Sequence, residues 1–147
     1  MKKERHFGYY EAILQLREVN QDVLEFSLDE IEKRNVSIAK AVKLKTGVDY
    51  YLSDQQFTKA LGKKLQKKFG GQLVVTAKLF GVRKGKEVYR VTVLFRVIHV
   101  KRGDTISYQG EEWLVKAITK HISAFNEHTK KKIHIQFKDA RKIKVIS

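Results

Sequence analysis

The sequence contains no cysteine and no proline. Without cysteine the chain can form neither a disulfide nor a thiolate zinc site, and its redox compartment is left open. No window holds the roughly 18 uncharged apolar residues that a membrane-spanning helix needs. The first residues, MKKERH, are followed by no signal-peptide apolar core. We therefore expect a soluble, cytoplasmic protein that does not associate with membranes.

Acidic residues are scarce relative to basic ones. The chain has 31 Lys and Arg against 16 Asp and Glu, a formal net charge of +15 and a sequence pI near 10.0. This imbalance favours a polyanionic partner, and nucleic acid is the first candidate. The alternative is a solvated lysine-rich surface of the kind found in proteins from hot environments, but that composition predicts balanced charge. With 42% hydrophobic residues, the 147-residue chain can bury a core in one domain or two small ones.

A cationic amphipathic helix is the stretch around which the chain is organised. Ser53 is the predicted N-cap, with Gln56 completing a capping box, and Gly70 and Gly71 end the helix. Apolar residues recur at spacings of three and four, at Phe57, Ala60, Leu61, Leu65 and Phe69. The solvent face carries five lysines, which are Lys59, Lys63, Lys64, Lys67 and Lys68.

The residues around this helix predict the first domain. Strand patterns cover residues 7–17, 36–45, 48–52, 72–80 and 87–98, and a second helix covers residues 23–34. The order strand-helix-strand, strand-helix-strand, strand is typical of an α+β fold. We expect residues 1–98 to form a two-helix antiparallel-sheet sandwich of the split βαβ kind, with both helices on one face.

After residue 98 the sequence pattern changes to short predicted strands. They cover residues 104–108, 112–118, 121–125, 132–137 and 141–146, separated by polar turns. Such strands predict a small all-β, SH3-like barrel over residues 99–147, with Trp113 and Val115 in its core. No Gly/Ser/Pro-rich linker separates the two domains, so we expect one rigid body.

Catalytic and metal-binding patterns are absent from the sequence. The five histidines, His6, His99, His121, His128 and His134, have no recognised metal spacing with a carboxylate. No Gly-x-Ser-x-Gly elbow, P-loop or dinucleotide fingerprint occurs. A lone Asp49 beside two tyrosines is a weak acid site. We expect no catalytic residue, no metal, no cofactor and no enzymatic activity.

Basic clusters at three places favour phosphate binding. Besides the helix lysines, Arg83, Lys84 and Lys86 lie at a predicted hairpin tip between residues 81 and 86, and Lys130, Lys131 and Lys132 lie at a predicted barrel turn. For each cluster alone, a solvated face is an equally good interpretation. Tyr9-Tyr10 and Tyr50-Tyr51 each place one ring on either side of a strand. One ring of each pair is expected in the core. The other, with Tyr50 and Tyr51 as the candidates, either covers a sheet edge or stacks on an unpaired base.

The order of these segments resembles the middle region of the nonsense-mediated-decay protein three family. The resemblance rests on YYEAILQLR (residues 9–17), GVDYYLS (residues 47–53), the helix from Gln56 to Phe69-Gly70-Gly71, Lys78-Leu79, and GKEVYRVTVLFR (residues 85–96). The amino-acid sequence of these segments resembles archaeal members of the family more than eukaryotic ones. Family members carry paired CxxC zinc sites in an N-terminal region, so the resemblance implies that this cysteine-free chain is the central part of a longer protein.

The family is known in eukaryotes as the export adaptor of the large ribosomal subunit. The resemblance implies a ribosome-associated factor that binds the large subunit and its ribosomal RNA during late maturation or quality control. We expect a monomer with these two partners. The alternative is a protein-interaction scaffold in which an edge strand of the barrel pairs with a partner and the basic charge serves only for steering.

Overall fold

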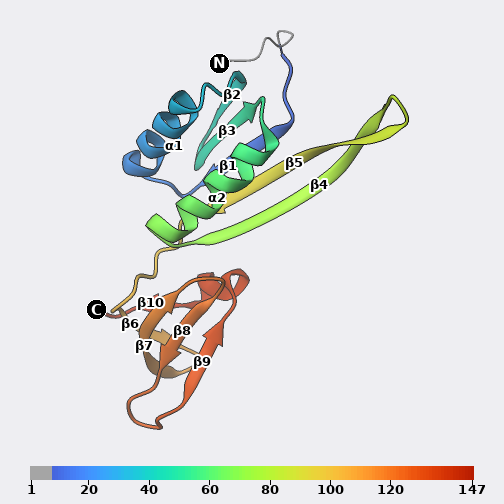
Figure 1. The fold of residues 1–147 in the computed structure, drawn as a ribbon. Helices are drawn as coiled ribbons and strands as arrows, with labels where there is room; N and C mark the ends of the chain where they lie inside the picture. The colour runs from blue at the N-terminus through green and yellow to red at the C-terminus, as the bar shows by residue number, and fades with distance from the viewer. Residues whose placement is uncertain (1–7) are drawn as a thin grey trace. The chain divides into compact units, whose positions relative to one another are not determined.

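The computed structural model describes residues 8–147. These residues form two compact units (Figure 1). The first contains the residues up to Phe69 together with Leu73–Arg96, and the second contains Gly70–Gln72 together with Val97–Ser147. Each unit holds one five-stranded sheet, and both helices longer than two turns belong to the first. The predicted α+β class with a small β domain is therefore confirmed.

The sheet of the first unit has the strand order β2-β3-β1-β5-β4. Its strands are β1 (Ala12–Arg17), β2 (Ile38–Leu44), β3 (Gly47–Leu52), β4 (Gln72–Arg83) and β5 (Lys86–Arg96). β3 pairs antiparallel with both β1 and β2, but β1 and β5 run parallel, with Leu14 opposite Val93. The prediction of a wholly antiparallel sheet is wrong at this pairing.

The parallel pair follows from the connections. A helix between two strands returns the chain to the same end of a sheet, so β1-α1-β2 and β3-α2-β4 each join parallel strands. In the sheet, β3 lies between β1 and β2, and β1 and β5 lie between β3 and β4. Both strand-helix-strand segments are therefore split βαβ motifs. The hairpin reverses β5 relative to β4, and β5 therefore opposes β3 in direction and runs parallel to β1.

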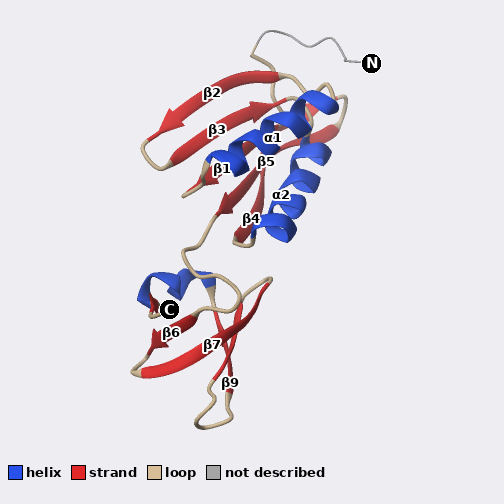
Figure 2. Cartoon of the chain, turned by 90° about the vertical axis from the view of Figure 1, so that its left-hand side faces the viewer, coloured by secondary structure: helices blue, strands red, loops and turns tan. Residues whose placement is uncertain are grey.

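Helices α1 (Gln21–Lys33) and α2 (Gln55–Phe69) cover one face of this sheet (Figure 2). Alternate residues of the central strands are buried beneath them, including Leu14, Leu16, Val93 and Phe95. α2 approaches the sheet closely at Gly62, where a Cβ atom would lie 2.6 Å from Cγ1 of Val93. No helix among residues 8–147 is long and apolar enough to cross a membrane.

The N-terminus of α2 differs from the prediction. The Asp54 carboxylate accepts a hydrogen bond from the backbone N–H of Phe57 at 2.9 Å, which is the contact of an N-cap. The Ser53 hydroxyl instead accepts the N–H of Ser37 at 2.9 Å. Ser53 is therefore a link between segments of the sheet, and the predicted capping box with Gln56 is wrong.

Strand bounds also differ where turns decide them. The predicted first strand began at Phe7, which lies outside the described residues, and β1 begins only at Ala12. β4 and β5 run further than expected and leave a two-residue turn, Lys84-Gly85, with φ of 49° and 75°. Positive φ at both positions is typical of the type I′ turn, whose twist matches the flanking strands, so the longer predicted loop is wrong.

The second unit has the strand order β10-β6-β7-β8-β9. Its elements are β6 (Thr105–Tyr108), β7 (Glu111–Ile118), β8 (Ile122–Phe125), β9 (Lys132–Ile135), the 3₁₀ helix η1 (Phe137–Lys142) and β10 (Lys144–Val145). Trp113 and Val115 are buried in its core, as predicted. The SH3-like closure of this sheet remains a prediction.

The 3₁₀ helix η1 includes the first two residues of the region predicted as the last strand, Arg141 and Lys142. Ala140 and Ile143 are both buried, and their spacing of three matches the period of a 3₁₀ turn. Val145, which strand alternation would place on the same face as Ile143, is exposed. The predicted strand 141–146 is therefore wrong over most of its length, and only Lys144–Val145 pairs with β6.

Candidate nucleic-acid interface

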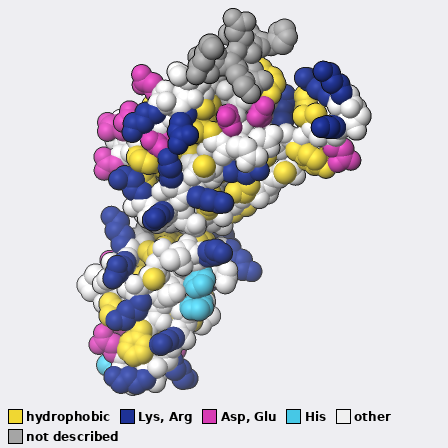
Figure 3. All heavy atoms as spheres, viewed as in Figure 1, with side chains coloured by type: hydrophobic (Ala, Val, Ile, Leu, Met, Phe, Trp, Pro, Cys, Tyr) yellow, Lys and Arg dark blue, Asp and Glu magenta, His cyan; other side chains and the backbone are white. Residues whose placement is uncertain are grey.

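Lys63 and Lys67 of α2 lie on the side of the helix that faces away from the sheet. Leu61 and Leu65 are buried against the sheet, and this orientation leaves Lys63 and Lys67 exposed to solvent. Lys59 is partly buried. In Figure 3, basic side chains gather over this helix region, beside acidic ones over α1. The exposed ammonium groups lie four residues apart, one turn along the helix.

Lys64 and Lys68 are engaged with α1. Nζ of Lys64 lies 2.7 Å from Oε1 of Glu30, and Lys33 approaches the same carboxylate at 3.5 Å. The hydrogen bond from Lys64 lowers the pKa of Glu30 below its ordinary value. Nζ of Lys68 lies 5.4 Å from the ring centroid of Phe26, within cation–π range. The structure thus divides the five predicted lysines into helix-packing residues and outward-facing ones.

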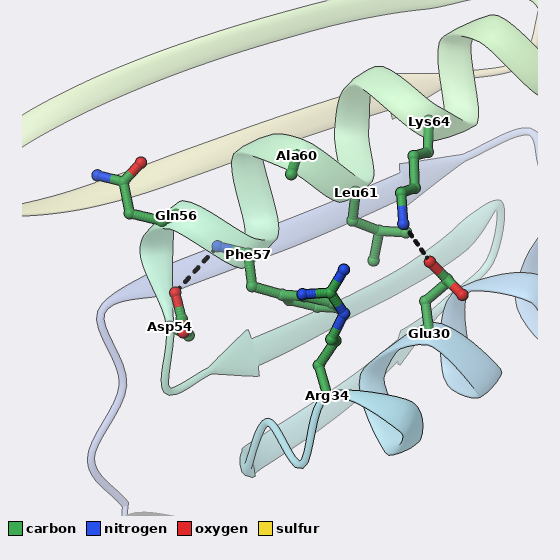
Figure 4. A pocket seen from close by; sticks show the side chains of 8 residues that line it. All are labelled: Glu30, Arg34, Asp54, Gln56, Phe57, Ala60, Leu61 and Lys64. Carbon is green, nitrogen blue, oxygen red and sulfur yellow. Dashed lines mark hydrogen bonds and ion pairs between the residues drawn. The ribbon is translucent and has the colours of Figure 1, made fainter.

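A pocket of about 370 Å³ lies between α1 and α2 (Figure 4). It is lined by Glu30, Arg34, Asp54, Gln56, Phe57, Ala60, Leu61 and Lys64. Glu30 is paired with Lys64 and Asp54 caps α2, so both carboxylates have partners within the fold. Phe57 and Leu61 give the pocket an apolar wall. The arrangement suits packing of the two helices better than acid–base chemistry, which needs a carboxylate facing a substrate.

The β4–β5 hairpin carries the second basic cluster at its tip. Arg83, Lys84 and Lys86 are all exposed, and the hairpin extends beyond the helices as a long arm (Figure 1). Figure 3 shows basic side chains at its end and hydrophobic ones along it. The exposed hydrophobic residues of β4 include Val82, 65% exposed, and Phe80, 49% exposed. The tight turn holds three cations on a narrow protrusion, which fits a phosphate backbone or a groove.

The third cluster lies in the turn between β8 and β9 of the second unit. Asn126 organises this turn, because its Oδ1 accepts the N–H groups of His128 at 2.9 Å and of Thr129 at 3.1 Å. Lys130 adopts a φ of 64° and donates its N–H to the Asn126 carbonyl at 2.8 Å. The result is a structured turn that exposes Lys130, Lys131 and Lys132.

Of the two candidate stacking rings, only Tyr51 is available. Tyr50 faces the helices and is 8% exposed, and burial raises the pKa of its hydroxyl. Its ring cannot receive a base. Tyr51 points to the other face of the sheet, which neither α1 nor α2 covers (Figure 2). There its ring lies edge-on to Tyr10, with centroids 4.9 Å apart.

Three further residues on the same face as Tyr51 were not predicted, namely Lys40, Arg90 and Phe80. Nζ of Lys40 lies 5.1 Å from the Tyr51 ring centroid, and the Arg90 guanidinium lies between the rings of Tyr10 and Phe80. The signal for Arg90 was its place in β5, where it alternates with the buried Val91 and Val93 and so had to face outward. Its contact with Phe80 depends on the pairing of β4 with β5.

Histidines and carboxylates form no metal-binding group of three or more within the part of the chain that the structure describes. His121 and His134 are neighbours, with ring centroids 4.0 Å apart, and the ring of His99 bonds the Ile143 carbonyl at 2.9 Å. His6 lies outside the described residues. Asp49, predicted as a weak acid site, forms an ion pair with Arg17, with 2.7 Å between its Oδ1 and Nη1 of the guanidinium.

Comparison with protein families gives one match. The family model described as the second domain of NMD3 matches residues 9–97. This range contains both helices, all five strands of the first sheet and the hairpin tip. A comparison with curated proteins found no match.

Proposed function

The chain belongs to the NMD3 family, because the matched domain covers more than half of it, and from this premise we propose that it binds the large ribosomal subunit through ribosomal RNA. The family is the one that the sequence resembles, so the predicted membership is confirmed. Membership implies association with a ribosomal subunit. Contact with ribosomal RNA of the large subunit, during late maturation or quality control, is the proposal.

The exposed lysines of α2 carry this proposal. Lys63 and Lys67 have fixed positions, because Leu61 and Leu65 on the opposite side of the helix are fully buried. Like charges one turn apart cost an isolated helix a few tenths of a kcal/mol, a cost that bound phosphates would reverse. The hairpin tip adds Arg83, Lys84 and Lys86 on a second rigid element. Such contacts position a protein on RNA without reading its sequence.

The proposed role is not enzymatic and needs no cofactor. This part of the proposal is supported by the carboxylates that have partners within the fold. Glu30 and Asp54, which line the pocket between α1 and α2, and Asp49 of β3 are each held by an ion pair or a helix cap. A binding module needs fixed cations and shape, and the first unit supplies both.

Co-sedimentation with purified large ribosomal subunits across a salt series tests the proposal. Saturable binding is expected to persist near physiological salt, with a log–log slope of roughly 0.7 to 0.9 per phosphate contact. The double variant Lys63→Glu, Lys67→Glu should lose most of this binding. The control, Lys43→Glu with Lys45→Glu, makes the same change in net charge at exposed positions near the end of β2 and in the following turn, and should retain it.

Equal binding to subunits, naked ribosomal RNA and duplex DNA that vanishes with modest salt would contradict the proposal, since it would indicate generic attraction.

The second candidate function, a protein-interaction scaffold, is favoured by the edge strand β9 (Lys132–Ile135) at the end of the second sheet. An edge strand can accept a strand from a partner. Under that function the Lys63→Glu, Lys67→Glu variant would bind its partner almost normally.

A further inference from the structure

A row of aromatic and cationic side chains crosses the uncovered face of the first sheet. Its members are Lys40 of β2, Tyr51 of β3, Tyr10 just before β1, Arg90 of β5 and Phe80 of β4. Four of the five strands contribute one member each, and Tyr10 precedes the fifth strand, β1. We refer to these five residues as the cation–aromatic row.

Contacts join each member of the row to the next. Nζ of Lys40 lies 5.1 Å from the Tyr51 ring centroid, and the rings of Tyr51 and Tyr10 meet edge-on at 4.9 Å. Cζ of Arg90 lies 3.9 Å from the Tyr10 ring centroid and 3.6 Å from that of Phe80. Nη1 of Arg90 also donates to the Tyr10 hydroxyl at 3.1 Å. The guanidinium is therefore fixed in place between two rings, with further N–H groups on its edge.

Solvent reaches this row. Phe80 is 49% exposed although one face of its ring lies on Arg90, Lys40 is exposed, and Tyr10, Tyr51 and Arg90 are half-buried. A cation–π contact made only for stability gains most when it is desolvated, which this row is not. Exposed rings with fixed orientation instead offer surfaces on which another flat group can stack.

The charge of the surrounding face favours an anionic partner. The carboxylate of Asp49, two residues before Tyr51 in β3, pairs with Arg17, and that of Glu11 accepts the Gln55 N–H at 3.0 Å. Arg17 and Arg96 are register partners on β1 and β5. Asp49 compensates the charge of Arg17, whereas Arg96 lies six residues along β5 from Arg90, about 20 Å at 3.3 Å per residue. Cations thus lie both within the row and further along the same face.

We propose that the uncovered face of this sheet binds an unpaired stretch of RNA, with bases stacking on Phe80 and Tyr51 and phosphates following Arg90, Lys40 and Arg96. This proposal rests on the proposed function and adds to it the class of RNA and a second surface. Sheets with exposed aromatic residues stack about two or three bases. Duplex RNA does not fit, because its base faces already stack on each other, so the face selects unpaired nucleotides.

The test measures binding of the full chain to two fluorescein-labelled probes, an unpaired RNA of about ten nucleotides and a duplex RNA of equal length. Phe80→Leu removes the ring but keeps the charge and the apolar bulk. We expect it to weaken binding of the unpaired probe about tenfold and to leave duplex binding unchanged, because loss of one stacked base costs about that much. Tyr51→Leu should act in the same direction.

Two further variants are the controls. Val82→Ala changes another exposed apolar residue of β4 outside the row and should alter neither affinity. Phe80→Trp keeps a ring and should retain binding of the unpaired probe. Thermal unfolding of each variant by circular dichroism verifies that the fold is kept, as expected for changes at exposed positions.

Wild-type affinity of Phe80→Leu for the unpaired probe overturns the inference, and so does equal wild-type affinity for the two probes. If Phe80→Leu binds the probe normally but co-sediments poorly with large subunits, the face binds a ribosomal protein, which also overturns it. Co-sedimentation of the Lys63→Glu, Lys67→Glu variant reports on the proposed function separately, because those lysines lie on the other side of the sheet.

Discussion

Glu30 is the acidic residue that ties the two helices together. Its carboxylate is nearly buried in α1 and lies 2.7 Å from Nζ of Lys64 in α2. An ion pair with one well-fixed member costs less side-chain entropy to form than one between two mobile surface groups. The same contact takes Lys64 out of the set of lysines that are fully available to a phosphate. A charge pattern along one helix therefore combines residues that pack with residues that bind.

Removal of Lys64 should destabilise the fold in a pH-dependent way. The pKa of Glu30 is lowered from an ordinary value of 4.5, so its ionised form stabilises the folded state. That stabilisation is complete above pH 4.5 and is lost as the pH falls through the lowered pKa of Glu30. Lys64→Gln should lower the free energy of unfolding by about 0.5 to 1 kcal/mol at pH 7, a value that allows for solvent screening of the half-exposed ammonium.

Urea unfolding at pH 7 and at a pH well below 4.5 measures this difference. Lys67→Gln makes the same charge change at an exposed position of the same helix and is the control. An equal loss of stability from Lys64→Gln at both pH values would show that the ion pair is not the source of the effect.

Helix α2 determines how the first unit packs. Its N-terminus is fixed by Asp54 and its middle by the close approach of Gly62 to the sheet. A Cβ atom at Gly62 would lie 2.6 Å from Cγ1 of Val93 and 2.8 Å from Cδ1 of Leu73. Val93 is fully buried, so it has little room to move. The helix can therefore not approach the sheet this closely with a larger residue at position 62.

Gly62→Ala should destabilise the protein despite the better helix propensity of alanine. The gain in propensity is about 1 kcal/mol, and overpacking in a well-filled core costs about 1 to 3 kcal/mol. We expect a net loss of about 1 kcal/mol in the free energy of unfolding, measured with urea. Ala60→Gly, at an exposed position of the same helix, measures the propensity contribution by itself. A stabilised Gly62→Ala variant would mean that α2 lies further from the sheet than the structure shows.

The molecule as a whole combines two cores with a large excess of positive charge. One core lies between α1, α2 and the first sheet, and the other is formed by the second sheet and η1. A net charge of +15 destabilises any compact state through self-repulsion, while the ion pairs among the described residues are few. Repulsion should therefore outweigh these attractions in the response to salt.

Added salt should raise the thermal unfolding midpoint of the free protein. The Debye length falls from about 30 Å at 0.01 M to about 10 Å at 0.1 M ionic strength, so repulsion between distant lysines is screened before close ion pairs are. Calorimetry across this range measures the effect. The Lys63→Gln, Lys67→Gln variant should show a smaller increase than wild type. A midpoint that falls with salt would indicate that attractive pairs dominate.

Much of the site was predictable because it lies on regular elements. The spacing of Lys63 and Lys67 against Leu61 and Leu65 fixed which side of α2 is charged, and the tip cations followed from the hairpin pattern. The partners of single residues were not predictable. Asp54 caps α2 in place of Ser53, because the Ser53 hydroxyl accepts a hydrogen bond from the N–H of Ser37, sixteen residues away in the chain.

The sequence by itself determined the α+β class, the family, the basic character and the two helices, because periodicity and composition are local properties. Only the tertiary structure decided that β1 and β5 run parallel, that Tyr50 is buried while Tyr51 is not, and that Lys64 pairs with Glu30. It also brought Lys40, Tyr51, Tyr10, Arg90 and Phe80 into one row. Strand order and register join residues up to eighty positions apart, and no local pattern along the chain specifies such pairings.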